Sequence, residues 1–516
     1  MTNQEISDGA MLNFYPDSLG GKLSDAVRFL QQPELGDAFS YLYILPSLFN
    51  TDLDRGFSVK DYGFNPELAA PEDLDNIKAL GLSLKLDFIL NHASVLSPQF
   101  QDLLENGENS KYADFFINWN KFWENCGKMT DKGYIQPDDK YLKEMFFRKL
   151  GLPLLMVEMP NGQSVPYWNT FYQQINENEP DLKKRYLGQM DLNTKSPLVW
   201  DFYDNTLQTL SSYGAKIVRL DAFAYASKEL GKRNFLNEPE IWDLLSQVKI
   251  LADKRSITLL PEIHASYSEK IYLKLSQKGY IVYDFFLPGL VIDALEHHNS
   301  ELLALWATEL AANGIRTVNM LGCHDGIPLL DLKGLVPDER ILALIDLTVS
   351  RGGYVKNLHG QKNVYYQVNA TYYSALGEDD RKMLLARALQ IFMPGKPQVW
   401  YLDLFAGKND HQAVIRAGRD GHKEINRTNL TAEQIAAGME QEITLKQLKL
   451  LRFRNACPAF GFDAHITASC PSPEELTVTW ENNGATARLN ANLAKAAFDI
   501  TATNSSGQTV FQYESV

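Results

Sequence analysis

Three acidic residues stand directly behind short apolar runs at separate places along the chain. Asp221 ends the sequence Val-Arg-Leu-Asp, Glu262 follows Leu-Leu-Pro, and Asp325 lies within Cys-His-Asp-Gly. Retaining glycoside chemistry requires one carboxylate that attacks an anomeric carbon and one carboxylic acid that protonates the departing oxygen. Any single acid at a strand end is about as often a helix N-cap as a catalytic residue. Three such acids, two of them accompanied by histidine, favour a catalytic site.

Arg219 precedes Asp221 by two residues. Alternate residues of a strand point to the same face, so the guanidinium can lie beside the carboxyl group of Asp221 and keep it ionised.

The elements that must hold these acids are short apolar runs separated by longer amphipathic stretches. Eight runs are too short for helices and read as strands, at 11–15, 39–45, 82–90, 215–220, 257–261, 280–285, 315–321 and 398–402. Eight strands with helical patterns between them predict an α/β fold, the TIM (β/α)8 barrel. Because the acids follow strands, they fall on the carboxyl-terminal rim, where barrel enzymes carry their catalytic residues.

Two intervals are too long for strand-to-helix loops and are expected to be insertions in the barrel. We therefore expect inserted subdomains and a small C-terminal antiparallel β domain. The expected division is barrel at 1–93, an inserted subdomain at 94–193, barrel at 194–325, a lid-like insertion at 326–377, barrel at 378–463 and a β domain at 464–516.

The composition of the 516 residues is that of a soluble globular protein, with 45% hydrophobic and 22% charged residues. A net charge of −14 without basic runs argues against nucleic acid as a partner. No apolar run reaches membrane-spanning length and the first residues lack a secretory signal, so we expect a cytoplasmic protein without membrane contact. The sequence lacks a Gly-x-Gly-x-x-Gly motif after a strand, which argues against a dehydrogenase.

Four short motifs, in this order, resemble those of the α-amylase superfamily. They are Asp87-x-x-x-Asn91-His92, Arg219-x-Asp221, Glu262 and His324-Asp325. The resemblance implies that Asp221 is the nucleophile, Glu262 the general acid/base and Asp325 a stabiliser of the transition state. It further implies that His92, Arg219 and His324 bind the glucosyl unit. In many amylases the motif asparagine ligates a structural calcium, but no companion acidic cluster is evident here, so we expect neither metal nor cofactor.

Over nearly its whole length the chain is similar to the sucrose phosphorylase group of that superfamily. The similarity lies in the segments 15–20, 54–57, 219–225, 262–267, 282–285, 324–327, 366–369, 371–376, 406–410 and 425–427. It implies an ion pair of Asp54 with Arg427 that closes the glucose pocket, so that only one sugar ring enters. It also implies substrate contacts from Gln189, Tyr366 and Gln367.

The acceptor side departs from this pattern. Val364 stands where the sucrose enzymes usually carry an acid, and Arg148 and Lys149 replace an arginine-rich loop. We expect Arg148 or Lys149, with Tyr366, to bind phosphate, and Val364 and Tyr365 to shape the acceptor site. The sequence is equally consistent with Arg148 and Lys149 being two solvent-exposed surface residues that bind no phosphate.

The expected function is phosphorolysis of sucrose to α-glucose 1-phosphate and fructose through a covalent glucosyl-enzyme. The partners are thus a small α-glucoside and inorganic phosphate, and the protein is expected to be a monomer or homodimer. The alternatives are phosphorylases of sucrose 6-phosphate, glucosylglycerol or glucosylglycerate, and a sucrose hydrolase or transglucosidase. A carbohydrate-binding barrel with a dead site is disfavoured because every acid of the motifs is present.

Overall fold

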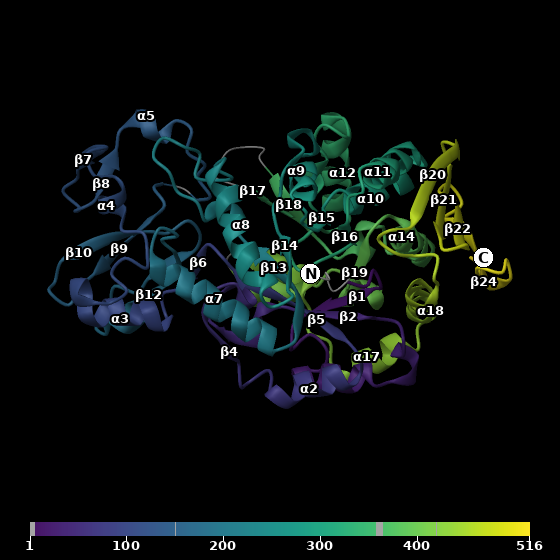
Figure 1. Ribbon diagram of the computed structural model, residues 1–516, viewed down its shortest axis with the longest axis horizontal. Helices are drawn as coiled ribbons and strands as arrows, with labels where there is room; N and C mark the ends of the chain where they lie inside the picture. The colour runs from purple at the N-terminus through teal and green to yellow at the C-terminus, as the bar shows by residue number, and fades with distance from the viewer. Residues whose placement is uncertain (1–5, 150, 358–364, 419–420, 516) are drawn as a thin grey trace.

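The eight predicted runs each overlap one strand of a single parallel sheet (Figure 1). The computed structural model describes residues 6–149, 151–357, 365–418 and 421–515. The strands are β1 (Met11–Phe14), β2 (Tyr41–Ile44), β5 (Ser83–Ile89), β13 (Ala215–Asp221), β14 (Thr258–Pro261), β15 (Val282–Asp284), β16 (Thr317–Met320) and β19 (Lys396–Trp400). Their order is β14-β13-β5-β2-β1-β19-β16-β15. Because β14 and β15 also contact each other, the sheet closes into the predicted TIM barrel.

Amphipathic helices cover the barrel, and α7 (Pro197–Ser212) shows why they form. Proline occupies its first turn, where a missing N–H costs nothing. Its buried residues recur every three or four positions, which is the spacing of one helix face: Val199, Tyr203, Thr206, Leu207 and Leu210. Shortly after it ends, Gly214 adopts a φ of +92°. The Tyr203 hydroxyl donates to the Leu90 carbonyl at 2.6 Å and so anchors the helix beside β5.

The long insertion between β5 and β13 forms the blue lobe at the left of Figure 1. It has an apolar cluster of its own around three buried tryptophans, Trp119, Trp123 and Trp168. Its two ends meet where β6 (His92–Ser94) pairs antiparallel with β12 (Tyr186–Asp191). The insertion is therefore attached at the barrel rim.

The chain after β16 forms the second insertion, with η7 (Leu329–Leu332), α12 (Asp338–Ser350), β17 (Tyr354–Asn357), β18 (Tyr365–Asn369) and α13 (Tyr372–Ala375). An antiparallel sheet ends the chain, as predicted, and it is yellow in Figure 1. Its strands are β20 (His465–Ser472), β21 (Glu475–Asn482), β22 (Ala485–Asn492), β23 (Ala497–Thr503) and β24 (Thr509–Glu514). Trp480 joins this sheet to the barrel, since its indole N–H donates to the Phe392 carbonyl at 2.7 Å.

The predicted strand limits differ from the observed ones by at most two residues. The eighth run, predicted at 398–402, is wrong at both ends: β19 begins at Lys396 and ends at Trp400, and α15 (Tyr401–Leu404) follows at once. The residue-level limits of the domains stay predictions. No helix within the described part of the chain is both long and apolar enough to cross a membrane.

Candidate active site

The strand register places the expected nucleophile and acid/base next to each other. β13 pairs in parallel with β14, Leu220 opposite Pro261, so Asp221 and Glu262 are the next residues on neighbouring strands. The Glu262 amide donates to the Leu220 carbonyl at 3.2 Å, which extends this pairing by one step. Since all barrel strands run in the same direction, both carboxyl groups lie on the carboxyl-terminal rim.

One buried guanidinium joins three acids at this rim. Arg219 Nη1 donates to Asp87 Oδ1 at 2.6 Å and to Asp221 Oδ1 at 2.8 Å. Its Nη2 lies 3.3 Å from Glu262 Oε1. Because Asp221 and Glu262 bind the same planar group, their carboxyls are close neighbours, as a retaining mechanism requires. Asp87, on β5, completes the network from behind, where the Tyr43 hydroxyl donates to it at 3.1 Å.

The two rim carboxyls hold their protons with different strength. Burial and the negative charge of Glu262, opposed by Arg219, raise the pKa of Asp221 to about 8. The expectation that Arg219 keeps Asp221 ionised is therefore wrong for the free site, because burial outweighs the guanidinium. For Glu262, burial acts in the same direction but is outweighed by Arg219 and His264, which lower its pKa to about 2. The pair therefore carries one proton between them below about pH 8. One protonated and one ionised carboxyl is the state that acid and nucleophile need together.

Asp325, in the loop after β16, is surrounded by positive and donor groups. His324 Nε2 lies 3.1 Å from Asp325 Oδ2, and Lys423 Nζ lies 2.8 Å from Oδ1. Arg427 Nη2 lies 3.7 Å from the same Oδ1. Burial alone raises the pKa of Asp325, but His324, Lys423 and Arg427 together hold it well below the usual range. Asp325 is thus ionised at neutral pH and can stabilise positive charge on a sugar ring.

Phe57 organises the expected donor pocket. Its carbonyl accepts a hydrogen bond from His92 Nε2 at 3.0 Å and another from Gln189 Nε2 at 3.0 Å. Its ring stacks on the imidazole of His324 with the centroids 5.1 Å apart. Three of the residues expected to bind the substrate, His92, Gln189 and His324, are therefore brought together around one residue.

The expected Asp54–Arg427 pair is described from one side only. Arg427 is buried and its Nε donates to the His324 carbonyl at 2.7 Å. The side chain of Asp54 lies outside the described residues. Closure of the pocket by this pair stays a prediction.

Asn91 lies in a buried cluster that contains a lysine. Lys228 Nζ donates to Asn91 Oδ1 at 3.0 Å and lies 2.8 Å from Asp191 Oδ2. Asn91 Nδ2 also donates to Asp191, at 3.1 Å. A divalent cation bound to these oxygens would meet the ammonium group, so the residues do not fit a calcium site. The ammonium of Lys228 neutralises the buried carboxylate instead.

We expect Lys228→Met to lower the free energy of unfolding by about 3–5 kcal/mol, because Asp191 would remain buried without its cation. Urea denaturation measures this loss. The control is Lys232→Met, since Lys232 pairs with the half-exposed Glu240 and such a pair contributes less than about 1 kcal/mol. Equal, small losses in both variants would show that the cluster does not depend on Lys228.

The residues expected on the acceptor side do not share one set of contacts. Arg148 hydrogen-bonds the hydroxyl of Tyr225 and lies 5.8 Å from the ring centre of Phe171. Lys149 donates instead to Asn169 Oδ1, and burial lowers its pKa to about 8. Gln367 is buried. Val364 and the side chains of Tyr365 and Tyr366 lie outside the described residues, so their roles stay predictions.

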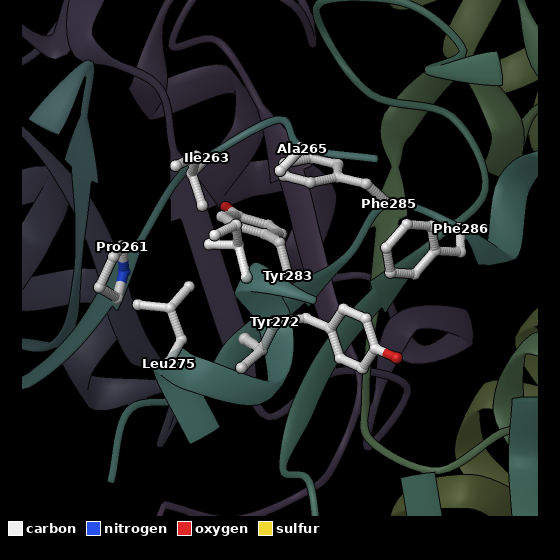
Figure 2. A pocket seen from close by; sticks show the side chains of 10 residues that line it. Pro261, Ile263, Ala265, Tyr272, Leu275, Tyr283, Phe285 and Phe286 are labelled. Atoms are coloured by element: carbon white, nitrogen blue, oxygen red, sulfur yellow. The ribbon is translucent and has the colours of Figure 1, made fainter. Parts of the chain in front are cut away.

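Sequence reasoning gave no role to His264, Asp331 or Lys423. His264 Nε2 lies 3.4 Å from Glu262 Oε1, and its Nδ1 lies 2.8 Å from Asp331 Oδ2. The spacing Glu262-x-His264 was a usable signal, because alternate residues after a strand point the same way. Asp331 and Lys423 gave no comparable signal. Figure 2 shows mainly apolar and aromatic side chains lining a pocket at this segment, among them Ile263, Ala265 and Phe285.

Comparison with known proteins gives a consistent result. The chain is 52% identical over 505 residues to sucrose 6F-phosphate phosphorylase of Ilumatobacter coccineus, covering 96% of each sequence. It is 33% identical to sucrose phosphorylase of Streptococcus mutans, covering 96% of this chain and 98% of the relative. No family model matches the chain.

A crystal structure supports the same similarity. The chain superposes with a TM-score of 0.88 on sucrose 6F-phosphate phosphorylase from Thermoanaerobacter thermosaccharolyticum, at 33% identity. The match covers 99% of this chain and 98% of the other. Fold and sequence similarity therefore extend from one end of the chain to the other.

Proposed function

Because the chain belongs to the sucrose phosphorylase family of the α-amylase superfamily, we propose that its substrate is sucrose 6F-phosphate. The enzyme is a phosphorylase: it cleaves a small α-glucoside with phosphate and releases α-glucose 1-phosphate. What the proposal adds is the leaving sugar, a fructose that carries a phosphate group, and the roles of individual residues.

In the proposed first displacement, Asp221 attacks the anomeric carbon and Glu262 protonates the glycosidic oxygen. A glucosyl ester on Asp221 forms as the bond to the leaving sugar breaks. The ionised Asp325 stabilises the positive charge that develops on the glucosyl ring. Arg219, which contacts both carboxyls, balances the changes in charge on Asp221 and Glu262.

The shared proton must lie on Glu262 when this step begins. In the free site Asp221 has the higher pKa. A bound glucoside changes the balance, because its glycosidic oxygen faces Glu262 and repels a carboxylate but accepts a hydrogen bond from a carboxylic acid. At the same time the electron-poor anomeric carbon faces Asp221 and favours its ionised form. Substrate binding therefore prepares both groups for reaction.

In the second displacement phosphate replaces the departed sugar and attacks the same carbon from the side opposite to Asp221. The ester bond to Asp221 breaks, and its carboxylate is regenerated. Two inversions give net retention, so the product is the α anomer. Phosphate is already an anion and needs little help from a base, whereas water must lose a proton to Glu262.

The observation that carries the choice of leaving sugar is the positive charge beside Tyr225. Arg148 hydrogen-bonds the Tyr225 hydroxyl, and the charges of Glu262 and Arg233 also act on it. Arg233 lies 5.3 Å from the ring centre of Phe235 and 5.5 Å from that of Phe146. Two guanidiniums act on a tyrosine on which the charge of Glu262 also acts, and such a concentration of positive charge suits a phosphorylated sugar. The sequence comparison with the Ilumatobacter coccineus relative supports the same choice.

We expect Arg148→Gln to lower kcat/KM for sucrose 6F-phosphate by about 10- to 100-fold, the value of one charge-assisted hydrogen bond. Turnover of unphosphorylated sucrose should change by less than about threefold, because that substrate lacks the anion. Formation of α-glucose 1-phosphate measures both. The matched control is Arg185→Gln, since Arg185 pairs with Glu158 elsewhere in the insertion.

The second candidate is sucrose itself, which the sequence favoured and the Streptococcus mutans relative supports. The same assay separates the two. The proposal of a phosphorylated leaving group is wrong if the wild-type enzyme prefers sucrose, or if Arg148→Gln lowers both activities equally.

A further inference from the structure

His264 connects the acid/base to the insertion that follows β16. Its Nδ1 lies 2.8 Å from Asp331 Oδ2, and its Nε2 lies 3.4 Å from Glu262 Oε1. The ring stacks on Phe285 with centroids 4.0 Å apart. The side chains of His264 and Asp331 are each only 8% exposed. The contact is thus buried and joins residues 67 positions apart in the chain.

We propose that Asp331 is a positioning residue for the acid/base: it keeps His264 charged and directed at Glu262, and so sets how strongly Glu262 holds its proton. The inference rests on the proposed role of Glu262. Asp331 acts through His264 and is not itself expected to touch the substrate.

The geometry favours an imidazolium. A neutral imidazole has one N–H and can donate to one carboxylate, whereas an imidazolium donates from both nitrogens. Glu262 and Asp331 lie at opposite nitrogens of the ring. Burial lowers the pKa of His264, but Asp331 and Glu262 outweigh it and raise the pKa to about 10. His264 is therefore a cation at neutral pH.

Other charged groups act on the two carboxylates. Three charged groups act on the pKa of Glu262: Arg219 and His264 lower it, and Asp325 raises it. Glu262 and Glu269 act on Asp331. Lys85 is buried behind the rim, and that burial holds its pKa well below the usual range. Among these groups, Arg219 and His264 are the cations that lower the pKa of Glu262.

The fold holds Asp331 in place from two directions. It lies in η7, directly after a segment in which Ile327 exchanges hydrogen bonds of 2.8 and 3.1 Å with Val368 of β18. Beyond η7, the Ser268 amide donates to the Lys333 carbonyl at 3.2 Å. Gly334 has a φ of +90°, and a Cβ there would lie 2.7 Å from the Ser268 side chain. The loop that carries His264 and the insertion that carries Asp331 are therefore docked against each other.

Asp331→Asn tests the proposal through the pH dependence of kcat/KM. In the wild type we expect the basic limb near pH 8, where the Asp221–Glu262 pair loses its last proton. In the variant His264 becomes neutral, the pair holds that proton more strongly, and the limb moves to higher pH by about 1 unit. With α-glucosyl fluoride, whose leaving group needs no proton, the two enzymes should differ little in this limb.

Three further variants separate positioning from folding. Asp331→Glu keeps the negative charge and should return the limb toward pH 8. Asp338→Asn removes an exposed acid of the same insertion, 70% exposed, and should change nothing. If Asp331→Asn does not fold, His264→Gln should show the same alkaline shift.

Two outcomes overturn the inference. One is a lower kcat/KM in Asp331→Asn with both limbs unmoved, which would show a merely structural role. The other is an equal alkaline shift with α-glucosyl fluoride. The role of Glu262 is tested separately: if Glu262→Gln keeps the basic limb, the proposed acid/base itself is wrong.

Discussion

Asp221→Asn should abolish phosphorolysis, with kcat/KM lower by on the order of 10⁴-fold or more. The amide has nearly the same shape as the carboxyl and can still accept from Arg219, which donates to Asp221 Oδ1 at 2.8 Å. It cannot attack the anomeric carbon or form the glucosyl ester. Release of α-glucose 1-phosphate under saturating phosphate measures the loss.

The same variant should fold at least as well as the wild type. The pKa of Asp221 is raised to about 8 in the folded protein, so the protonated form stabilises the fold below the unfolded pKa of about 4. That stabilisation is lost as the pH rises through about 8, because the buried group must ionise. Asparagine suffers no such loss, so the difference in Tm should favour the variant at pH 8 more than at pH 5.

Asp201→Asn is the matched control, since Asp201 is exposed on α7. It should keep full activity. Activity of more than a few per cent in Asp221→Asn would reject Asp221 as the nucleophile.

Glu262→Gln should slow cleavage of the natural glucoside by about 10²- to 10⁴-fold, the usual contribution of a general acid. Its activity with α-glucosyl fluoride should be close to that of the wild type, because fluoride leaves without a proton. The glucosyl-enzyme then formed should react with azide or phosphate but only slowly with water, which needs a base. Stopped assays with each donor and acceptor measure these differences.

The control for this variant is Glu301→Gln, an exposed glutamate in the first turn of α11 (Glu301–Ala312). It should behave as the wild type with both donors. An unchanged pH profile in Glu262→Gln, or an equal defect with α-glucosyl fluoride, would contradict the role of Glu262.

The barrel and its acids were predictable because two features of the sequence agree: the eight short apolar runs, and the acids at the ends of three of them. Each of the eight short apolar runs overlaps a strand, and the acids lie at or just after the ends of those strands. Parallel strands of a barrel end on one rim, so Asp221, Glu262 and Asp325 had to come together there. The ion pairs of Arg219 with Asp221 and Glu262 follow from the register of β13 and β14.

What could not be predicted are contacts made by loops. Lys228 reaches Asp191 across the joint between barrel and insertion, and no spacing in the sequence links the two. His264 meets Asp331 because two loops dock, and Lys423 reaches Asp325 from a short helix late in the chain. Such contacts depend on three-dimensional packing between distant segments. The residues of the acceptor site are less predictable from the sequence for the same reason.

We propose that the glucosyl unit is bound as an ester to Asp221 between the two displacements. To test this, Glu262→Gln is mixed with α-glucosyl fluoride in the absence of phosphate, and the reaction is stopped in acid. Peptide mass spectrometry then locates the added glucosyl unit. We expect one glucosyl unit on the peptide that contains Asp221, and its disappearance when phosphate is added before the stop. A label on another residue, or a β-configured product formed without any labelled peptide, would contradict it.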